Sequence, residues 1–308
     1  MGLNDMKMNA KIKKYSKELN LWGTKFLLRF LPHILPIKKN KVLFLSDYRE
    51  KLGGNLGIVY EYLKDKDYKC VFSLKKARSV KRSMLEKMKL IYFLVTSEYI
   101  LLEDMVAITS YMNVRKGQEL VQLWHGPGAF KKFAFSRITN NKKVAIHAGY
   151  KKYTKAIVSS EQIRWCYAEA FGIEVDKVKA TGFPRTDIFF DKKYIEDVKT
   201  KFYKLYPQLK EKKLILFAPT YRGEKVSDFS YDYSQLDFKK LYEYYHDEYV
   251  FAIKWHPMHY SNILSGKRRP PDFSEYGDFI LDFSTYRDIN DLLIVCDLLI
   301  TDYSSVIF

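Results

Sequence analysis

Two histidines lie at positions where an imidazole could take up a proton during a reaction. His125 and His256 each follow a short apolar run, and each is followed at once by Gly or Pro. Such a run is typical of a buried strand, and Gly or Pro marks the turn that ends it. Because the pKa of histidine lies near neutral pH, a histidine at the end of a strand can act as a general base. The pattern alone leaves a structural or merely exposed histidine open.

Other polar side chains follow apolar runs further along the chain. Arg222 comes after a Pro-Thr turn, and its planar guanidinium could bind two phosphate oxygens. Asp302, Ser304 and Ser305 follow another run, where free backbone amides at a helix start could hold an anion. Both groups also have structural interpretations, since Ser and Asp are common N-caps and Arg222 could be a solvated loop residue. Together these residue types suggest a large anionic ligand.

Three basic side chains and two short motifs are weaker indications of ligand or metal binding. Lys131 and Lys132 follow the His125 turn and could contact an acidic acceptor or simply be solvated. Arg185 lies in a turn after another apolar run. Gly53–Gly57 resembles a phosphate-binding loop but matches neither the GxGxxG nor the Walker pattern. Asp65–Asp67 is a DxD-like run that we interpret as surface, so we predict no dedicated metal site.

The elements between these side chains must position them. Short apolar, β-rich runs alternate with polar stretches of helix length, which is typical of a buried parallel sheet with crossover helices. A break between two such series falls at Asp191–Pro207. We therefore expect an α/β fold of two doubly wound units that face one another, with ligands outside the carboxyl ends of the strands. The predicted strands are Val42–Ser46, Cys70–Leu74, Leu90–Val95, Leu120–Trp124, Ala156–Ser159, Val178–Thr181, Leu214–Phe217, Val250–Lys254 and Leu298–Thr301.

The first 40 residues form a basic segment. They carry nine Lys or Arg and two Asp or Glu, a net charge of +7 out of +17 for the chain of 308 residues. Apolar residues recur at spacings of three and four and would form one stripe of a helix: Ile12, Tyr15, Leu19, Trp22, Phe26 and Phe30. The basic residues outside this stripe are Lys11, Lys14, Lys17, Lys25 and Arg29. The pattern is typical of a helix lying in a membrane interface, and packing on the protein's own core is the alternative.

The amino-acid composition excludes some classes of protein and favours others. With 47% hydrophobic and 16% aromatic residues, the chain is neither disordered nor of low complexity. Its excess positive charge implies an anionic partner, such as nucleic acid, phospholipid or a phosphorylated substrate. The apolar runs are far shorter than the ~20 residues of a membrane span, and three scattered cysteines favour a reducing compartment over a disulfide framework. A basic membrane- or nucleic-acid-binding protein without catalysis is the alternative outside the enzymes, although no nucleic-acid-binding signature is evident.

Five motifs, taken in their order along the chain, resemble one family. They are Gln122–Lys132, Thr181–Asp187, Phe217–Arg222, Lys254–Pro257 and Ile300–Ile307. The set is similar to the motifs of the CDP-glycerol glycerophosphotransferase family of teichoic-acid synthesis, which includes ribitol-phosphate transferases. Two features depart from that pattern. The usual His-Gly-Thr-Pro is His-Gly-Pro-Gly in this sequence, and the chain ends inside the last motif, so we expect an incomplete second domain.

The resemblance implies a fold similar to GT-B glycosyltransferases, with two Rossmann-like domains facing a cleft and no metal or cofactor. The expected parts are a basic segment over 1–40, an acceptor-side domain over 41–190 and a CDP-polyol-binding domain over 191–308. His125 would be the base that acts on the acceptor hydroxyl, and His256 would lie near the donor pyrophosphate. The positions that match donor-binding motifs are Thr220, Arg222, Ser304, Ser305 and Asp302, the last of which could instead brace the loop. Residues expected on the acceptor side are Lys131, Lys132 and Arg185.

The reaction implied by the resemblance moves glycerol phosphate from CDP-glycerol to a lipid-linked polyol-phosphate acceptor and releases CMP. A CDP-ribitol donor or a capsule-type acceptor is the alternative within this class. Such an enzyme would act as a peripheral protein at the cytoplasmic face of the membrane. Its partners would be the donor, the acceptor and an anionic lipid surface, with no nucleic acid.

Overall fold

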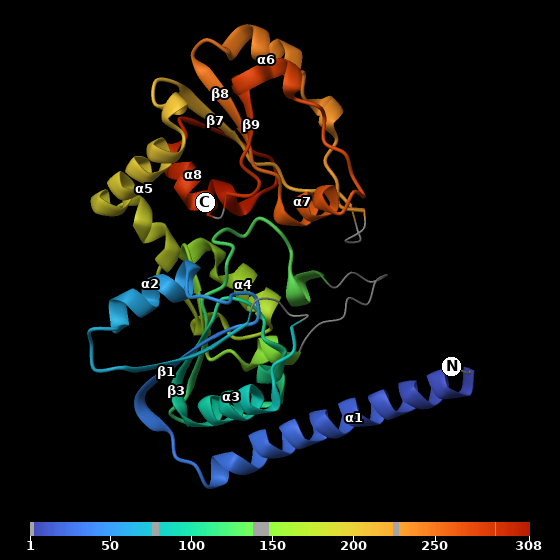
Figure 1. Ribbon diagram of the computed structural model, residues 1–308. Coiled ribbons are helices and arrows are strands. Elements are labelled where there is room, and N and C mark those ends of the chain that lie inside the picture. The colour runs from blue at the N-terminus through green and yellow to red at the C-terminus, as the bar shows by residue number, and fades with distance from the viewer. Residues whose placement is uncertain (1–2, 76–79, 138–147, 224–227, 287) are drawn as a thin grey trace. The chain divides into compact units, whose positions relative to one another are not determined.

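The chain folds into two compact α/β units. The computed structural model describes residues 3–75, 80–137, 148–223, 228–286 and 288–308 (Figure 1). Unit 1 comprises Met1–Arg185 and unit 2 comprises Thr186–Phe308. The division falls in the turn that contains Arg185, ahead of the stretch where the sequence suggested a break. The basic N-terminal segment belongs to unit 1.

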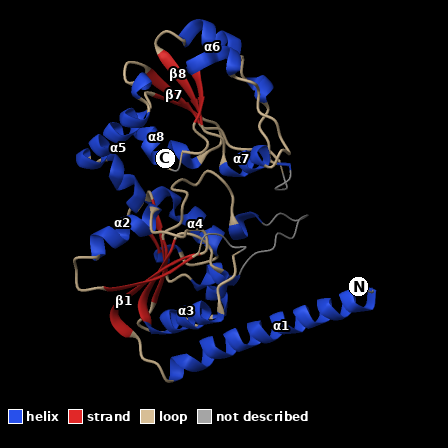
Figure 2. Cartoon of the chain, viewed as in Figure 1, coloured by secondary structure: helices blue, strands red, loops and turns tan. Residues whose placement is uncertain are grey.

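Unit 1 is built on a parallel sheet of six strands. Its spatial order is β2-β1-β3-β4-β5-β6, and every neighbouring pair is parallel. Apolar side chains cover both faces, so that helix α2 packs on one face and helices α3 and α4 on the other (Figure 2). The strands are β1 (Lys38–Ser46), β2 (Lys69–Leu74), β3 (Ser97–Leu102), β4 (Glu119–Gln122), β5 (Lys155–Val158) and β6 (Val178–Ala180). The helices are α2 (Gly54–Leu63), α3 (Met84–Thr96) and α4 (Arg164–Phe171).

Unit 2 repeats this plan with four strands in the order β10-β7-β8-β9, again all parallel. Helices α5 and α8 pack on one face of the sheet, and α6 and α7 on the other. The strands are β7 (Lys213–Phe217), β8 (Tyr249–Ile253), β9 (Ile280–Asp282) and β10 (Leu298–Ile300). The helices are α5 (Lys192–Leu205), α6 (Phe238–Tyr245), α7 (Pro257–Leu264) and α8 (Ile289–Val295). The prediction of buried parallel α/β structure is confirmed in each unit.

One predicted strand is wrong. Leu90–Val95 forms the last part of helix α3, and the strand β3 begins directly after it at Ser97. A short apolar run does not distinguish a buried strand from the buried face of a helix. The deciding signal lies upstream, where Ser83 and Glu86 form a capping box that starts the helix. The sequence prediction also lacks β3, which follows α3 directly, and the three-residue strand β9.

Helix α1 (Leu3–Phe30) packs on unit 1 through a face different from the predicted stripe. Leu28 is 1% exposed and Thr24 is buried, and the helix contacts α3. Five residues of the stripe face outward. Their exposed fractions are 47–70%, for Tyr15, Leu19, Trp22, Phe26 and Phe30. Packing of these five residues on the protein's own core is therefore excluded. The side chains of Lys11, Ile12, Lys14 and Lys17 lie outside the described residues.

Trp22, Phe26 and Phe30 stack on one another along the exposed face of α1, with ring centroids 5.5–5.6 Å apart. Lys25 and Arg29 are exposed on the same helix. Within the described residues, no helix is long and apolar enough to cross a membrane.

Candidate active site

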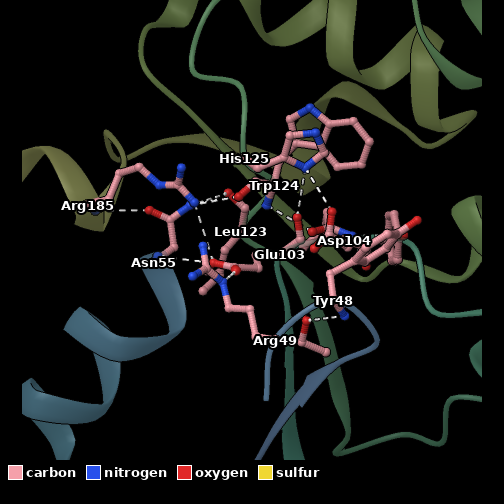
Figure 3. A network of polar contacts seen from close by, with 12 residues as sticks. Tyr48, Arg49, Asn55, Glu103, Asp104, Leu123, Trp124, His125 and Arg185 are labelled. Atoms are coloured by element: carbon pink, nitrogen blue, oxygen red, sulfur yellow. Dashed lines mark hydrogen bonds and ion pairs between the residues drawn. The ribbon is translucent and has the colours of Figure 1, made fainter. Parts of the chain in front are cut away.

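His125 lies just past the carboxyl end of β4, beside the carboxyl end of β3. The register pairs Leu102 of β3 with Gln122 of β4. The residues that follow the two strands are therefore neighbours, which brings Glu103 and Asp104 to His125 (Figure 3). This is the edge at which parallel α/β sheets bind ligands.

Two acceptors hold one nitrogen of the His125 ring. Nδ1 lies 3.2 Å from Oδ1 of Asp104 and 3.1 Å from the carbonyl oxygen of Glu103. Because both partners accept hydrogen bonds, Nδ1 carries the proton in the neutral ring and Nε2 carries the lone pair. The side chain is 51% exposed, so a substrate hydroxyl can reach it. This is the arrangement of a general base oriented by a carboxylate.

The same contacts set the protonation of His125. Partial burial lowers the pKa of the imidazole, but the hydrogen bond to Asp104, the charge of that carboxylate and the Glu103 carbonyl outweigh this effect. The pKa of His125 is raised overall. The imidazole can therefore accept a proton readily, and the resulting cation is stabilised by Asp104.

Glu103 is the centre of a buried charge network beneath His125. Its carboxylate is 1% exposed and forms an ion pair with Arg49, while Nη2 of Arg185 lies 3.6 Å from Oε2. The backbone N–H of Asn55, in the first turn of α2, donates to the same Oε2 at 3.1 Å. Arg185, predicted on the acceptor side, thus belongs to this network in unit 1.

The Gly-Gly-Asn segment at the start of α2 does not have the character of a phosphate-binding loop. Gly54 has φ +56°, and a Cβ at this position would meet Nη2 of Arg49 and lie 2.8 Å from Oε2 of Glu103. Glycine is therefore favoured by its left-handed φ and by the close approach of the Arg49–Glu103 ion pair. The helix N-terminus that could have bound a phosphate already binds Glu103.

Two side-chain hydroxyls hold the turn after His125 through its backbone carbonyls. The hydroxyl of Tyr167 donates to the carbonyl oxygens of Gly126 and Gly128, and the hydroxyl of Ser159 donates to that of Pro127 at 2.8 Å. Burial raises the pKa of Tyr167, which keeps its hydroxyl protonated as a donor. Further along, the side chains of Lys131 and Lys132 are exposed.

Unit 2 brings three of the predicted donor-binding residues together. Strands β7 and β10 are neighbours, with Phe217 paired to Ile300, so the residues after each strand meet. Oδ2 of Asp302 lies 2.8 Å from Nη2 of Arg222, and Oδ1 accepts the backbone N–H of Thr220 at 2.8 Å. Asp302 therefore braces the loop, as the sequence allowed. Arg222 is 48% exposed and keeps guanidinium donors for a ligand.

The remaining predicted residues of unit 2 lie at the same strand edge. His256 follows β8, which neighbours β7, and its half-buried ring packs edge-on against Tyr221 at 4.7 Å between centroids. Ser304 caps a short 3₁₀ helix over Ser305–Ile307, accepting the N–H of Val306 at 3.3 Å. Ser305 is exposed. A helix of three residues adds little dipole, so an anion here would rely mainly on Arg222 and His256.

Sequence reasoning missed the groups that orient His125. Glu103 and Asp104 directly follow β3. The sequence prediction lacked this strand because it placed a strand at Leu90–Val95 instead, so these two residues were not recognised as lying at a strand end. Arg49 lies in the loop after β1, and Asn55 lies in the first turn of α2, within the Gly53–Gly57 run that was interpreted only as a weak phosphate-loop signal. Within the described residues, no three His, Cys, Asp or Glu side chains form a group that could hold a metal ion.

Solved structures share the fold of this chain. The structure of the wall teichoic acid polymerase TagF aligns with 99% of this chain and 76% of that protein, at a TM-score of 0.66 and 19% identity. A UDP-N-acetylglucosamine 2-epimerase from Rickettsia bellii aligns with 85% of this chain and 74% of that protein, at a TM-score of 0.54 and 12% identity. At such identities the likeness concerns the fold alone.

Several curated proteins are more similar to this chain in sequence than these two solved structures are. The teichoic acid poly(ribitol-phosphate) polymerase of Bacillus spizizenii is 45% identical over 278 residues, which is 89% of this chain and 44% of the relative. The ribitol-phosphate polymerase TarK of Staphylococcus aureus is 39% identical over 89% of this chain and 54% of its own length. The glycerol-phosphate primase of Bacillus subtilis is 32% identical over 74% of this chain and 56% of its own length.

The chain thus spans about half the length of the curated relatives it matches. A family model described as CDP-Glycerol:Poly(glycerophosphate) glycerophosphotransferase matches residues 27–308, which include His125 and every other site residue described above. This match covers far more than half of the chain and agrees with the resemblance seen in the five motifs. The chain belongs to the CDP-Glycerol:Poly(glycerophosphate) glycerophosphotransferase family.

Proposed function

We propose that this chain transfers a polyol phosphate from a CDP-polyol to a hydroxyl group of a polyol-phosphate acceptor and releases CMP. The observation that carries the proposal is the His125–Asp104 pair at the end of β4, where Nδ1 is held 3.2 Å from the carboxylate and the ring is half exposed. Family membership supplies the class of donor. Together they favour an enzyme over a non-catalytic membrane- or nucleic-acid-binding protein.

In the proposed step, Nε2 of His125 takes the proton of the acceptor hydroxyl. The acceptor oxygen then forms a bond to the phosphorus that bears the polyol. The bond from this phosphorus to the bridging oxygen breaks, and CMP leaves with the electron pair. Asp104 stabilises the imidazolium that forms, since its carboxylate lies beside Nδ1. Positioning and electrostatics carry most of the catalysis in such a transfer.

The residues of unit 2 would bind the donor. Arg222 offers a planar cation that can meet two phosphate oxygens, and Asp302 fixes its direction through a contact of 2.8 Å. His256, Thr220, Ser304 and Ser305 lie at the ends of neighbouring strands and would complete the pyrophosphate site. These groups hold the charge that develops on the departing CMP, and none of them needs to move a proton.

We infer that CDP-ribitol is the better donor. Polymerases named for ribitol phosphate reach 45% and 39% identity to this chain, whereas a glycerol-phosphate primase reaches 32%. The sequence motifs alone favoured CDP-glycerol, which becomes the second candidate. The choice of ribitol over glycerol therefore rests on these relatives.

We also propose that α1 attaches the protein to the cytoplasmic face of the membrane. Its outer face presents the stacked rings of Trp22, Phe26 and Phe30, with Lys25 and Arg29 exposed on the same helix. Aromatic rings can enter the headgroup region while cations meet anionic lipid. Such attachment would bring the protein to a lipid-linked acceptor.

CMP release tests the proposed reaction. The purified chain is incubated with CDP-ribitol or CDP-glycerol, with and without a lipid-linked acceptor that ends in polyol phosphate. We expect CMP release that requires the acceptor and is faster with CDP-ribitol. Faster release with CDP-glycerol would reverse the choice of donor. Failure of both donors to give acceptor-dependent release would reject the proposed reaction.

A further inference from the structure

The residue before His125 has a backbone conformation that needs support. Trp124 has φ +54°, in the left-handed region where a side chain with a Cβ is disfavoured. The imidazole of the next residue lies 3.2 Å from Oδ1 of Asp104. The Trp124 ring stacks on the His125 ring at 4.4 Å between centroids, so the two residues are placed as one unit.

Two buried amides hold Trp124 at both of its peptide groups. Its N–H donates to Oε1 of Gln122 at 2.8 Å, and its carbonyl oxygen accepts from Nδ2 of Asn55 at 2.7 Å. Gln122 is the last residue of β4, two residues before Trp124. Asn55 lies 69 residues earlier in the chain and is fully buried, so it ties the His125 turn to a separate element, helix α2.

Asn55 is itself fixed by further contacts. Its backbone N–H donates to Oε2 of Glu103 at 3.1 Å, and its Oδ1 accepts the backbone N–H of Arg185 at 2.9 Å. The carbonyl of Glu103 in turn accepts from Nδ1 of His125. One chain of contacts therefore runs from the Trp124 carbonyl through Asn55 and Glu103 to the His125 ring (Figure 3).

We propose that Asn55 is a positioning residue for His125, and that it acts by holding Trp124 in its left-handed conformation. This gives the Gly-Gly-Asn segment at the start of α2 a role that its resemblance to a phosphate loop did not suggest: Gly54 allows the close approach of Arg49 and Glu103, and the asparagine orients the base. Its effect on turnover rests on the proposed function, whereas its effect on the His125 ring does not.

The test compares Asn55→Asp with Gln118→Glu. Asn55→Asp is isosteric and keeps the acceptor for the Arg185 amide, but a carboxylate cannot donate to the Trp124 carbonyl. Gln118 is also buried, and its amide donates to the carbonyls of Leu94 and Ser97. Because it precedes β4 and so lies at the opposite end of that strand from His125, Gln118→Glu is the matched control.

The readouts are the Tm, CMP-release kinetics, and the NMR titration of His125, assigned with His125→Gln. We expect both variants to lower the Tm. Only Asn55→Asp should reduce kcat, by roughly 10- to 100-fold as expected for a displaced base, with KM for the CDP-polyol unchanged within about twofold. The new carboxylate of Asn55→Asp would itself raise the pKa of a nearby imidazole, so the titration is read in Asn55→Ala and Gln118→Ala. Only Asn55→Ala should move the His125 titration, toward lower pH, as the ring leaves Asp104.

A His125 titration equal to wild type in Asn55→Ala, together with a kcat equal to wild type in Asn55→Asp, would overturn the proposal. If Asn55→Asp fails to fold, kcat is compared between Asn55→Ala and Gln118→Ala; Asn55→Ala removes the donor to Trp124 and also the acceptor of the Arg185 amide. If the wild-type protein releases no CMP, the proposed function fails. The titration still decides the role of Asn55 in that case, because it needs no substrate.

Discussion

The candidate base of unit 1 and the candidate phosphate ligands of unit 2 are held in different ways. His125 is 51% exposed and is held by Asp104, which is 20% exposed, and by the backbone carbonyl of Glu103, whose own carboxylate is 1% exposed within a charge network. Arg222 is 48% exposed and is braced by Asp302, which is 23% exposed. The difference matches the chemistry expected of each. A base must present one lone pair at one angle, whereas a phosphate ligand acts largely through charge and can adjust to its ligand.

The largest effect on the rate is expected when the candidate base is removed. His125→Ala should lower kcat for CMP release by ~10²–10⁴, the usual contribution of general-base catalysis. Binding of the CDP-polyol, measured by calorimetry, should be retained because we propose that the donor binds to unit 2. His256→Ala is the matched variant and should weaken donor binding. Loss of donor binding in His125→Ala, with binding and rate intact in His256→Ala, would contradict both assignments.

Asp104→Asn tests whether orientation and charge at Nδ1 matter. The carboxylate raises the pKa of His125, so its removal should lower that pKa. The acid limb of kcat/KM, where the base becomes protonated, should then move to lower pH. The maximum rate should fall by roughly 10- to 100-fold, because an amide can also stabilise the wrong tautomer. An unchanged acid limb would show that Asp104 does not act on the titrating base.

Arg222→Lys should have a smaller effect on the other side of the reaction. Lysine keeps the charge but cannot form two parallel hydrogen bonds to phosphate and to Asp302. We expect KM for the CDP-polyol to rise by about tenfold and kcat to change little. Donor kinetics equal to wild type would return Arg222 to the class of solvated loop residues.

The smallest effect is expected at α1 and concerns the acceptor side alone. Replacing Trp22, Phe26 and Phe30 by Ser should weaken binding to anionic vesicles and raise KM for a lipid-linked acceptor by roughly threefold. A water-soluble acceptor should be used as before, and the Tm should hold, since these rings are 47–64% exposed.

Leu28→Ala is the control for this helix. Leu28 is 1% exposed in the core of unit 1, so its truncation should lower the Tm while vesicle binding stays. If the triple variant binds vesicles as the wild type does, α1 is not the membrane-binding surface. Deletion of the whole segment would not separate these effects, because it removes Leu28 and Leu31 from the core.

The sequence predicted most of the fold because a strand buried on both faces must be apolar throughout. Eight of the nine predicted runs overlap strands of the structure. The exception, Leu90–Val95, shows the limit of this signal, since burial alone does not specify backbone geometry. Five residues of the predicted apolar stripe of α1 are exposed, so the alternative of packing on the core is excluded for them. The periodicity did not reveal that the helix contacts the core through Leu28 and Thr24.

The candidate site was predictable where one residue type carries the chemistry and follows a strand. This holds for His125, Arg222 and Asp302. The partners of His125 were not predictable, because Asp104 and Asn55 reach it only through the pairing of β3 with β4 and the position of α2. Neighbours of this kind depend on tertiary structure, and no local spacing reports them.

The burial of Glu103 bears on ligand exclusion in unit 1. Its carboxylate already fills the helix N-terminus after β1, which in parallel α/β folds commonly receives the phosphates of a nucleotide. A phosphate arriving there would meet a carboxylate that Arg49 and Arg185 already hold in place. We therefore expect Glu103 to compete with nucleotide phosphates for this helix N-terminus beside His125. In a reaction with a nucleotide donor and a polyol acceptor, such exclusion would keep the base available to the acceptor alone.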